Sequence, residues 1–353
     1  MPTPRPSLLL LLPRTTVITT TVSPLLPVRL VHHHPQQTSR RLYSTPSPTR
    51  LINLTDLPAP NSGRIRVLSL NRPAARNAIS KQLLAELRGH VDAIAGEYTA
   101  DGSDEVPPPS RFGGAAGPDR RGPTRALIVA SDVDSCFCAG ADLKERAGFS
   151  RDETDAFLSH LRATFAALAA LPIPTISAVA SPALGGGLEL ALCTHLRVLA
   201  STATVALPET RLAIIPGAGG TYRLPGLIGL ARARDLILTG RRVSGPEAYF
   251  LGIADRLVEI RDEDEDASDG ATAPEALARR LTRARERTLD EAIALAADIC
   301  RGGPVAVRAA LQAVAWAREE MENKSYERVV GTSDRDEALR AFREKRRPVF
   351  MGK

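Results

Sequence analysis

Two glutamates in this chain of 353 residues have the positions expected for paired acid/base chemistry. Glu189 follows three consecutive glycines in Ala183-Leu-Gly-Gly-Gly-Leu-Glu-Leu190, and Glu209 follows Pro208. The neighbours of Glu189 are apolar, so we expect a buried carboxyl whose raised pKa suits proton transfer. Each residue could instead be a surface glutamate in the first turn of a helix, stabilised by the helix dipole.

Two glycine-containing turns could supply hydrogen-bond donors beside these carboxyls. One is Cys136-Phe-Cys-Ala-Gly-Ala-Asp-Leu-Lys144, where Gly140 leads from a strand into polar sequence, and the other is the three-glycine turn before Glu189. Free N–H groups at the start of a helix can stabilise a negative oxygen. Either turn alone could serve only tight packing, but together they favour an oxyanion hole.

A third glycine-rich segment, Gly217-Ala-Gly-Gly220, ends an apolar loop after Glu209. It could be read as a phosphate cradle, but it lacks the Gly-Lys-Ser/Thr ending of a P-loop and the complete dinucleotide fingerprint. Nucleotide hydrolysis and NAD binding are therefore disfavoured. We expect this loop to form a wall of the active site.

The elements that must position these turns alternate between strand and helix. A helix is expected from Ser80, which can cap it ahead of regularly spaced apolar residues. Compact apolar runs predict strands, which are 64–70, 126–130, 175–180 and 196–200. This alternation implies an α/β architecture, followed by helices from about residue 274 to 342.

The net charge of +6 lies entirely in the first 50 residues, which hold six arginines and no acid, and the remainder has 40 basic and 40 acidic residues. This composition is typical of a mitochondrial transit peptide, with cleavage expected after Tyr43. A secretory signal is disfavoured because Pro13 and Arg14 interrupt the apolar run, and a disordered tail is the remaining alternative. We therefore expect import into the mitochondrial matrix.

Other residue classes exclude further functions. The four cysteines suit a reducing compartment, and Cys136-x-Cys138 lacks a second Cys/His pair at ligand spacing, so buried thiols are expected rather than a metal site. The three histidines at 32–34 lie in the leader, where a metal role is not expected. No apolar stretch after the leader is long enough to span a bilayer.

Taken together, the motifs resemble those of the enoyl-CoA hydratase/isomerase (crotonase) superfamily. The resemblance covers nearly everything after residue 63 except two insertions, and it implies an α/β, ClpP/crotonase-like fold of repeated ββα units with C-terminal helices. The segments that carry it are 71–78, 137–144, 174–179, 183–190, 216–224, 303–307 and 341–350.

With this resemblance the chain divides into a series of expected segments. They are a disordered transit peptide at 1–43, a linker at 44–62, a crotonase core at 63–260 with a surface insertion at 99–123, an acidic loop at 261–273 and a C-terminal helical region at 274–353. Related enzymes form trimers or hexamers, often through the C-terminal helices, so a homo-oligomer is expected.

The activity that the resemblance implies is addition of water across the 2,3 double bond of an enoyl-CoA, without a metal or redox cofactor. The resemblance also implies the roles of individual residues. The N–H groups of Ala141 and Gly186 would hold the thioester oxygen, Glu189 would activate water, and Glu209 would protonate the α-carbon. The likeness around 138–146 and 209–216 points to the branch that converts 3-methylglutaconyl-CoA to 3-hydroxy-3-methylglutaryl-CoA in leucine degradation. Short-chain enoyl-CoA hydration in fatty-acid β-oxidation is the alternative.

The resemblance places coenzyme A, as part of the substrate, near the Asn71-Arg-Pro turn and the segment 141–144. The expected substrate-binding residues include the oxyanion pair and are Ala75, Arg76, Ala141, Asp142, Leu143, Lys144, Gly186 and Gly217. Arg76 and Lys144 are candidate phosphate contacts, although both could be ordinary solvated charges.

Three rival functions remain open at this point. An isomerase of the superfamily often retains one of the two carboxylates, a CoA-ester hydrolase could use the same scaffold, and one relative is named for binding AU-rich RNA. The segment 80–98 offers only Lys81 and Arg88 as cations, so RNA binding through phosphate contacts is disfavoured.

The chain departs from its relatives at Ser181-Pro182, where proline could reshape the oxyanion turn, and at His195, for which we expect a structural role.

Overall fold

The computed structural model describes residues 50–106, 122–261 and 272–353. The predicted transit peptide, the middle of the predicted insertion and nearly all of the predicted acidic loop lie outside these residues. No helix in the described part of the chain combines the length and apolar character needed to cross a membrane.

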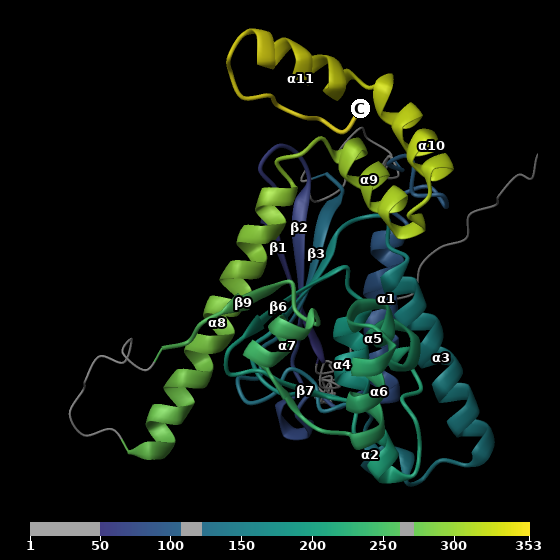
Figure 1. The fold of residues 1–353 in the computed structure, drawn as a ribbon, viewed down its shortest axis with the longest axis vertical. Helices are drawn as coiled ribbons and strands as arrows, with labels where there is room; N and C mark the ends of the chain where they lie inside the picture. The colour runs from purple at the N-terminus through teal and green to yellow at the C-terminus, as the bar shows by residue number, and fades with distance from the viewer. Residues whose placement is uncertain (1–49, 107–121, 262–271) are drawn as a thin grey trace, which may run out of the picture. The chain divides into compact units, whose positions relative to one another are not determined.

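The main sheet has six strands in the order β1-β2-β3-β4-β6-β9 (Figure 1). β1 is antiparallel to β2, and the other neighbouring pairs are parallel. The strands are β1 (Ile52–Pro58), β2 (Arg64–Leu70), β3 (Thr124–Ser131), β4 (Thr175–Val179), β6 (Leu196–Ala200) and β9 (Arg256–Val258). The four predicted strands are therefore confirmed, and β1 and β9 extend the sheet at its edges.

The prediction of a linker over 44–62 is wrong for residues 52–58, which form β1. Most side chains of β1 are exposed or half-buried, so its sequence carries little apolar signal. Its position is instead set by pairing with β2 along its whole length and by the carboxylate of Glu86, which accepts from the N–H groups of Leu51 and Ile52 at 3.0 Å. Such an edge strand is visible only once its partner is in place.

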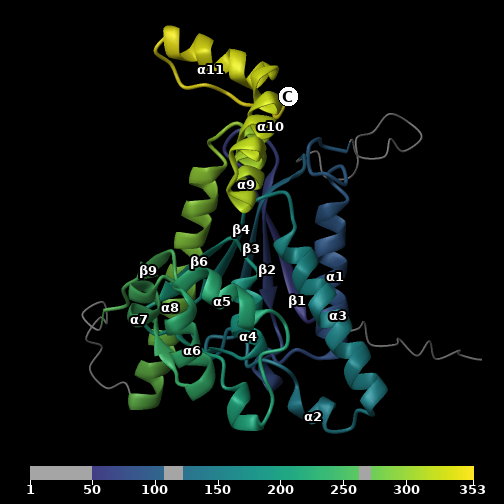
Figure 2. The ribbon, with the colours of Figure 1, turned by 45° about the vertical axis from the view of Figure 1, so that its right-hand side comes forward.

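Both faces of the sheet are covered by helices, as the alternation along β2 shows. Leu68 and Leu70 pack into the core shared with α1 (Lys81–Ala95) and α3 (Arg151–Ala169), which run side by side in Figure 1 and Figure 2. Ile65 and Val67 face the opposite core, which contains residues of α8 (Ala273–Ile299). Side chains that alternate along a strand point to opposite faces, so β2 needs apolar residues throughout.

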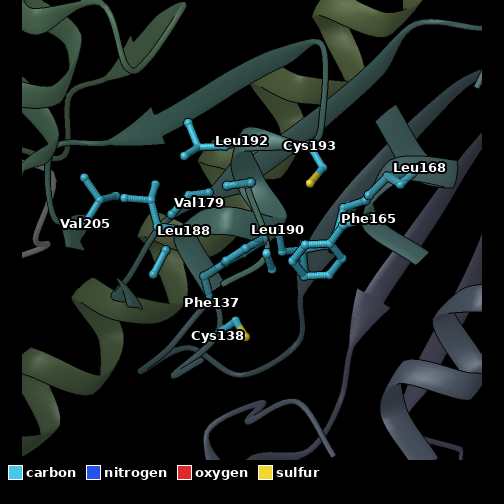
Figure 3. Packing of buried hydrophobic residues seen from close by; sticks show 14 of the residues in the cluster. Phe137, Cys138, Phe165, Leu168, Val179, Leu188, Leu190, Leu192, Cys193 and Val205 are labelled. Atoms are coloured by element: carbon cyan, nitrogen blue, oxygen red, sulfur yellow. The ribbon is translucent and has the colours of Figure 1, made fainter. Parts of the chain in front are cut away.

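The helix that carries Glu189 is itself buried. α4 (Gly186–Leu192) packs Leu188 and Leu190 among Phe137, Phe165 and neighbouring apolar residues (Figure 3). Gly187 to Leu192 are all buried. All four cysteines are buried and free, as expected.

The remaining elements before α8 form a second, smaller group, part of which contacts α4. A three-stranded sheet has the order β5-β7-β8. Its strands and the accompanying helices are β5 (Ala183–Leu184), β7 (Thr204–Ala206), β8 (Val243–Ser244), α5 (Gly220–Ile228), α6 (Leu230–Thr239) and α7 (Gly245–Leu251). Three short helical turns complete this region, and they are η1 (Pro73–Ala75), α2 (Leu143–Arg146) and η2 (Glu209–Leu212).

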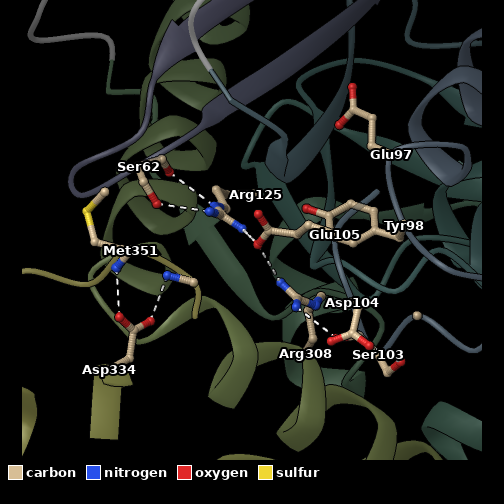
Figure 4. A network of polar contacts seen from close by, with 12 residues as sticks. Ser62, Glu97, Tyr98, Ser103, Asp104, Glu105, Arg125, Arg308, Asp334 and Met351 are labelled. Atoms are coloured by element: carbon tan, nitrogen blue, oxygen red, sulfur yellow. Dashed lines mark hydrogen bonds and ion pairs between the residues drawn. The ribbon is translucent and has the colours of Figure 1, made fainter. Parts of the chain in front are cut away.

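The C-terminal region is helical as predicted, with α8 followed by α9 (Pro304–Trp316), α10 (Glu319–Val330) and α11 (Ser333–Arg343). It is tied to the core by buried charges (Figure 4). The carboxylate of Glu105 lies between the guanidinium groups of Arg125 on β3 and Arg308 on α9. Glu105 falls within the predicted surface insertion, so the root of that insertion forms contacts between β3 and α9 rather than a free loop.

Candidate active site

A cavity of about 930 Å³ opens where α2, α3, α4, η2 and the loop before α5 meet. Six of the predicted site residues line it, and they are Ala141, Leu143, Gly186, Glu189, Glu209 and Gly217. The fold thus brings together residues from segments that are far apart in the sequence. Leu212, Ile214 and Ile215 add an apolar wall.

Glu189 enters this cavity with its carboxylate already hydrogen-bonded. Its Oε1 atom accepts from the backbone N–H of Ala218 at 2.8 Å and from that of Gly220 at 2.9 Å. Burial raises the pKa of Glu189, although these two hydrogen bonds and the nearby charges of Arg223 and Arg162 act in the opposite direction. The carboxylate therefore has a fixed orientation, which a general base requires.

Glu209 has a different environment. It begins η2 and is buried, yet its Oε2 atom has no hydrogen-bond partner among the described residues. Burial, with a further contribution from the negative charge of Glu189, raises the pKa of Glu209 to about 7. At neutral pH this carboxyl is thus poised between its two protonation states, so it can carry a proton to a bound substrate.

The two predicted oxyanion donors lie beside these carboxyls. Gly140 and Gly185 have positive φ angles of 91° and 53°, and each immediately precedes one donor. The N–H groups of Ala141 and Gly186 donate to no acceptor within the described ranges, and both residues line the cavity. Two such groups can bind one oxygen that develops negative charge.

Backbone hydrogen bonds to each other and to Ile79 hold the two turns in place. The N–H of Ile79 donates to the carbonyl of Gly140 at 2.8 Å, and the N–H of Leu184 donates to that of Cys138 at 3.0 Å. A Cβ atom on Gly187 would lie 2.1 Å from the carbonyl oxygen of Cys138. Only glycine permits this approach, so the glycine run serves both tight packing and the exposure of donors.

The two departures from the superfamily pattern fit into this framework. The carbonyl of Pro182 accepts from the N–H groups of Phe137 and Cys138 at 3.0 and 3.2 Å, so proline joins the two turns without needing an N–H of its own. His195 lies outside the cavity lining, and its Nδ1 atom is 3.1 Å from the N–H of Thr175. These contacts support the structural role expected for His195.

Four predicted substrate-binding residues do not line the cavity. Asp142 caps α2 through the N–H groups of Lys144 and Glu145, and it pairs with Arg72 at 2.7 Å, so its carboxylate already has partners. Lys144 is exposed on the first turn of α2, and Ala75 and Arg76 lie at the end of η1. Their predicted contacts with coenzyme A remain predictions.

Some features of the site were not predicted. The sequence predicted that the loop with the third glycine turn forms a wall of the site. It did not predict that the N–H groups of Ala218 and Gly220 donate to Glu189. Arg162 on α3 also lines the cavity. The Ser150-x-x-Glu153 capping box is a sequence signal for the start of α3, whereas nothing local indicates that Arg162 faces the site.

Comparison with known proteins agrees with this geometry. The model of the enoyl-CoA hydratase/isomerase family matches residues 120–353. The chain belongs to this family. Methylglutaconyl-CoA hydratase 1, mitochondrial, of Pyricularia oryzae is 64% identical over 317 residues, which cover 89% of this chain and 90% of that protein. The rat protein named methylglutaconyl-CoA hydratase, mitochondrial, is 37% identical over 321 residues, or 89% of this chain and 87% of the relative.

The fold is shared with solved structures of the family. The enoyl-CoA hydratase of Bacillus anthracis has a TM-score of 0.67 at 34% identity, covering 86% of this chain and 100% of that chain. The crotonase fold expected for this chain is thereby confirmed.

Proposed function

We propose that this family member is an enoyl-CoA hydratase whose substrate is 3-methylglutaconyl-CoA and whose product is 3-hydroxy-3-methylglutaryl-CoA. The proposal is carried by the placement of two buried glutamates with different hydrogen bonding in one cavity. The same cavity holds two backbone donors that have no acceptor among the described residues. The names of the fungal and rat relatives support the choice of substrate.

In the proposed reaction the thioester oxygen accepts from the N–H groups of Ala141 and Gly186. These donors stabilise the enolate-like charge that forms as water attacks C3, and removal of one such donor typically costs about 3 to 4 kcal/mol. Glu189 takes a proton from the attacking water, and Glu209 delivers a proton to C2. The C2–C3 π bond and one O–H bond of water break while C3–O and C2–H bonds form. The proton that Glu189 gains equals the one that Glu209 gives up, so the reaction needs no oxidant or reductant.

The carboxyl environments support this division of roles. The two N–H donors on Glu189 favour its ionised form, which can act as a base. Glu209, with a pKa of about 7, retains a proton in a substantial fraction of molecules at neutral pH. An isomerase needs only to move a proton between carbons, so the presence of both carboxyls favours hydration.

The proposal includes a location and an assembly. Relatives with mitochondrial names and the arginine-rich, acid-free leader support import into the mitochondrial matrix and a role in leucine degradation. Assembly into a homotrimer or homohexamer through the C-terminal helices is the expected quaternary state. Light scattering on the protein lacking residues 1–43 tests that assembly.

RNA binding is not favoured by the surface that suggested it. Lys81 pairs with Glu153 at 3.2 Å and lies 4.2 Å from the ring centre of Phe149, while Arg88 pairs with Asp92 at 2.7 Å. These cations therefore have acidic partners on the protein that would compete with phosphate contacts.

The proposed substrate is tested with a panel of enoyl-CoA thioesters. Loss of the enoyl thioester absorbance would be followed with 3-methylglutaconyl-, crotonyl- and longer enoyl-CoAs, together with release of free CoA thiol. We expect the highest kcat/KM for 3-methylglutaconyl-CoA and no thiol release. A strong preference for crotonyl-CoA would exclude the leucine-degradation assignment while leaving the hydratase class intact.

A further inference from the structure

Arg162 lines the cavity, but the proposed hydration gives it no role. It projects from α3, and its Nε atom donates to the carbonyl of Gly217 at 2.7 Å. Its Nη atoms have no acceptor among the residues that the structure describes, and the side chain remains accessible to solvent. One edge of the guanidinium is thus anchored while the other is available to a ligand.

The hydrogen bond that anchors Arg162 is formed with the residue that precedes a hydrogen-bond donor to Glu189. Arg162 binds the carbonyl of Gly217, and the next residue, Ala218, donates its N–H to Glu189. The guanidinium therefore lies on the wall that holds the general base. In the proposed reaction this wall faces C3, whereas the thioester end of the substrate lies at Ala141 and Gly186.

A chain extending from C3 away from the thioester would continue along the wall beside Glu189. In a dicarboxylic acyl group that extension ends in a carboxylate. A guanidinium with free N–H groups matches a carboxylate in charge and geometry, and a planar pair of hydrogen bonds is its preferred mode.

We infer that Arg162 recognises a carboxylate at the end of the acyl group remote from the thioester, and that it selects dicarboxylic acyl-CoA substrates. This inference rests on the proposed hydration and extends it by naming the residue that recognises the acyl group. Other cationic side chains nearby are less suited to the role. Arg223 donates to the carbonyl of Ala218 at 2.9 Å, stacks against Tyr222 and does not line the cavity.

Arg146 offers a matched comparison. It also lines the cavity, from the last turn of α2, but no described residue anchors its guanidinium next to the Glu189 wall. Arg146→Leu removes the same charge from the same cavity as Arg162→Leu. The two variants therefore distinguish a specific contact from the overall charge of the cavity.

The inference is tested by binding rather than by turnover of the proposed substrate. Two saturated, unreactive thioesters, 3-methylglutaryl-CoA and isovaleryl-CoA, differ only in the terminal carboxylate and would be measured as competitive inhibitors of crotonyl-CoA hydration. We expect the wild type to bind 3-methylglutaryl-CoA more tightly. Arg162→Leu should weaken that binding by roughly 10- to 100-fold, as for loss of a hydrogen bond to a charged group, and change isovaleryl-CoA binding less than about threefold.

Further variants sharpen the result. Arg162→Lys should retain part of the preference because it keeps the charge without the paired geometry, and Arg146→Leu should leave most of it. The inference is overturned if wild type does not distinguish the two inhibitors, or if Arg146→Leu alone removes the preference. It is also overturned if Arg162→Leu weakens both inhibitors and crotonyl-CoA turnover equally, because Arg162 would then act only by holding Gly217.

These outcomes are separable from failure of the proposed function. Absence of hydration with every enoyl-CoA would reject the hydratase proposal, whereas normal crotonyl-CoA hydration without carboxylate selection would reject only the role of Arg162.

Discussion

The carboxylate of Glu189 accepts a hydrogen bond of 2.8 Å from the N–H of Ala218, a residue 29 positions further along the chain. This bond joins the buried helix α4 to the third glycine-rich turn. In the proposed reaction, a base held in this way needs no reorganisation before it takes a proton, so the turn would assist catalysis without supplying a reactive side chain. The orientation of Glu189 thus depends on a segment far from it in the sequence.

Replacing either glutamate by glutamine should abolish most of the hydratase activity. Glu189→Gln removes the proposed base and Glu209→Gln the proposed acid, and each is expected to lower kcat for enoyl-CoA hydration by about 10²- to 10⁴-fold. Circular dichroism and thermal melting would establish that both variants fold. Wild-type rates in folded variants would contradict the assigned roles.

The pH dependence of hydration should reflect Glu209. Because its pKa lies at about 7 and its protonated form is needed to deliver a proton to C2, kcat/KM should fall as the pH rises through about 7. Initial rates between pH 5.5 and 9 in buffers of constant ionic strength would measure this limb. A flat profile across pH 6 to 8 would show that Glu209 is not the acid in the free enzyme.

Ionised Glu209 should also lower the stability of the fold. Its pKa is raised from an ordinary value of 4.5 to about 7, so the folded state binds the proton more tightly than the unfolded state does. The resulting destabilisation is absent below about pH 4.5, grows as the pH rises towards 7 and is complete above it. Glu209→Gln removes the charge and should therefore raise Tm by a few degrees at pH 8.

That gain in Tm should largely disappear at pH 5, where the wild-type carboxyl is mostly protonated in the folded state. Differential scanning fluorimetry at the two pH values makes the comparison. A Tm difference independent of pH would mean that the glutamine acts through packing instead of charge.

Gly140→Ala should disable the oxyanion site. Gly140 has a φ of 91°, and a Cβ atom there would lie 2.6 Å from the carbonyl oxygen of Leu184, so the backbone that presents the Ala141 N–H must shift. We expect kcat to fall by about 10²- to 10³-fold, as for loss of one oxyanion donor. Gly226→Ala is the matched control because its Cβ atom meets nothing within 4 Å, and it should leave the rate unchanged.

Glu105→Ala should destabilise the attachment of α9. Side chains of Arg125 and Arg308 are only 5% and 3% exposed, so removal of the carboxylate between them leaves two buried cations close together. A loss of about 3 to 5 kcal/mol in the free energy of unfolding is expected. Asp336→Ala, which removes a 75% exposed carboxylate paired with Arg335, should change that free energy by less than about 1 kcal/mol in urea denaturation.

Much of this protein follows from local sequence. Apolar runs predicted the inner strands, Ser80 predicted the start of α1, and the glycine turns predicted where donors would be exposed. These predictions succeed because strand burial, helix capping and close backbone approach each require particular residues within a few positions. β1 escaped prediction because an exposed edge strand needs little apolar character.

By itself, the sequence determined the superfamily, because two glutamates and two glycine turns with these neighbours are a pattern specific to it. Only the tertiary structure decided the environment of each glutamate. The hydrogen bonds from Ala218 and Gly220 orient Glu189, and the contact with Gly217 anchors Arg162. One oxygen of Glu209 has no partner in the described part of the chain, and the pKa of this carboxyl is raised. Proton affinity and side-chain orientation depend on burial and on partners far along the chain, and folding alone brings those partners together.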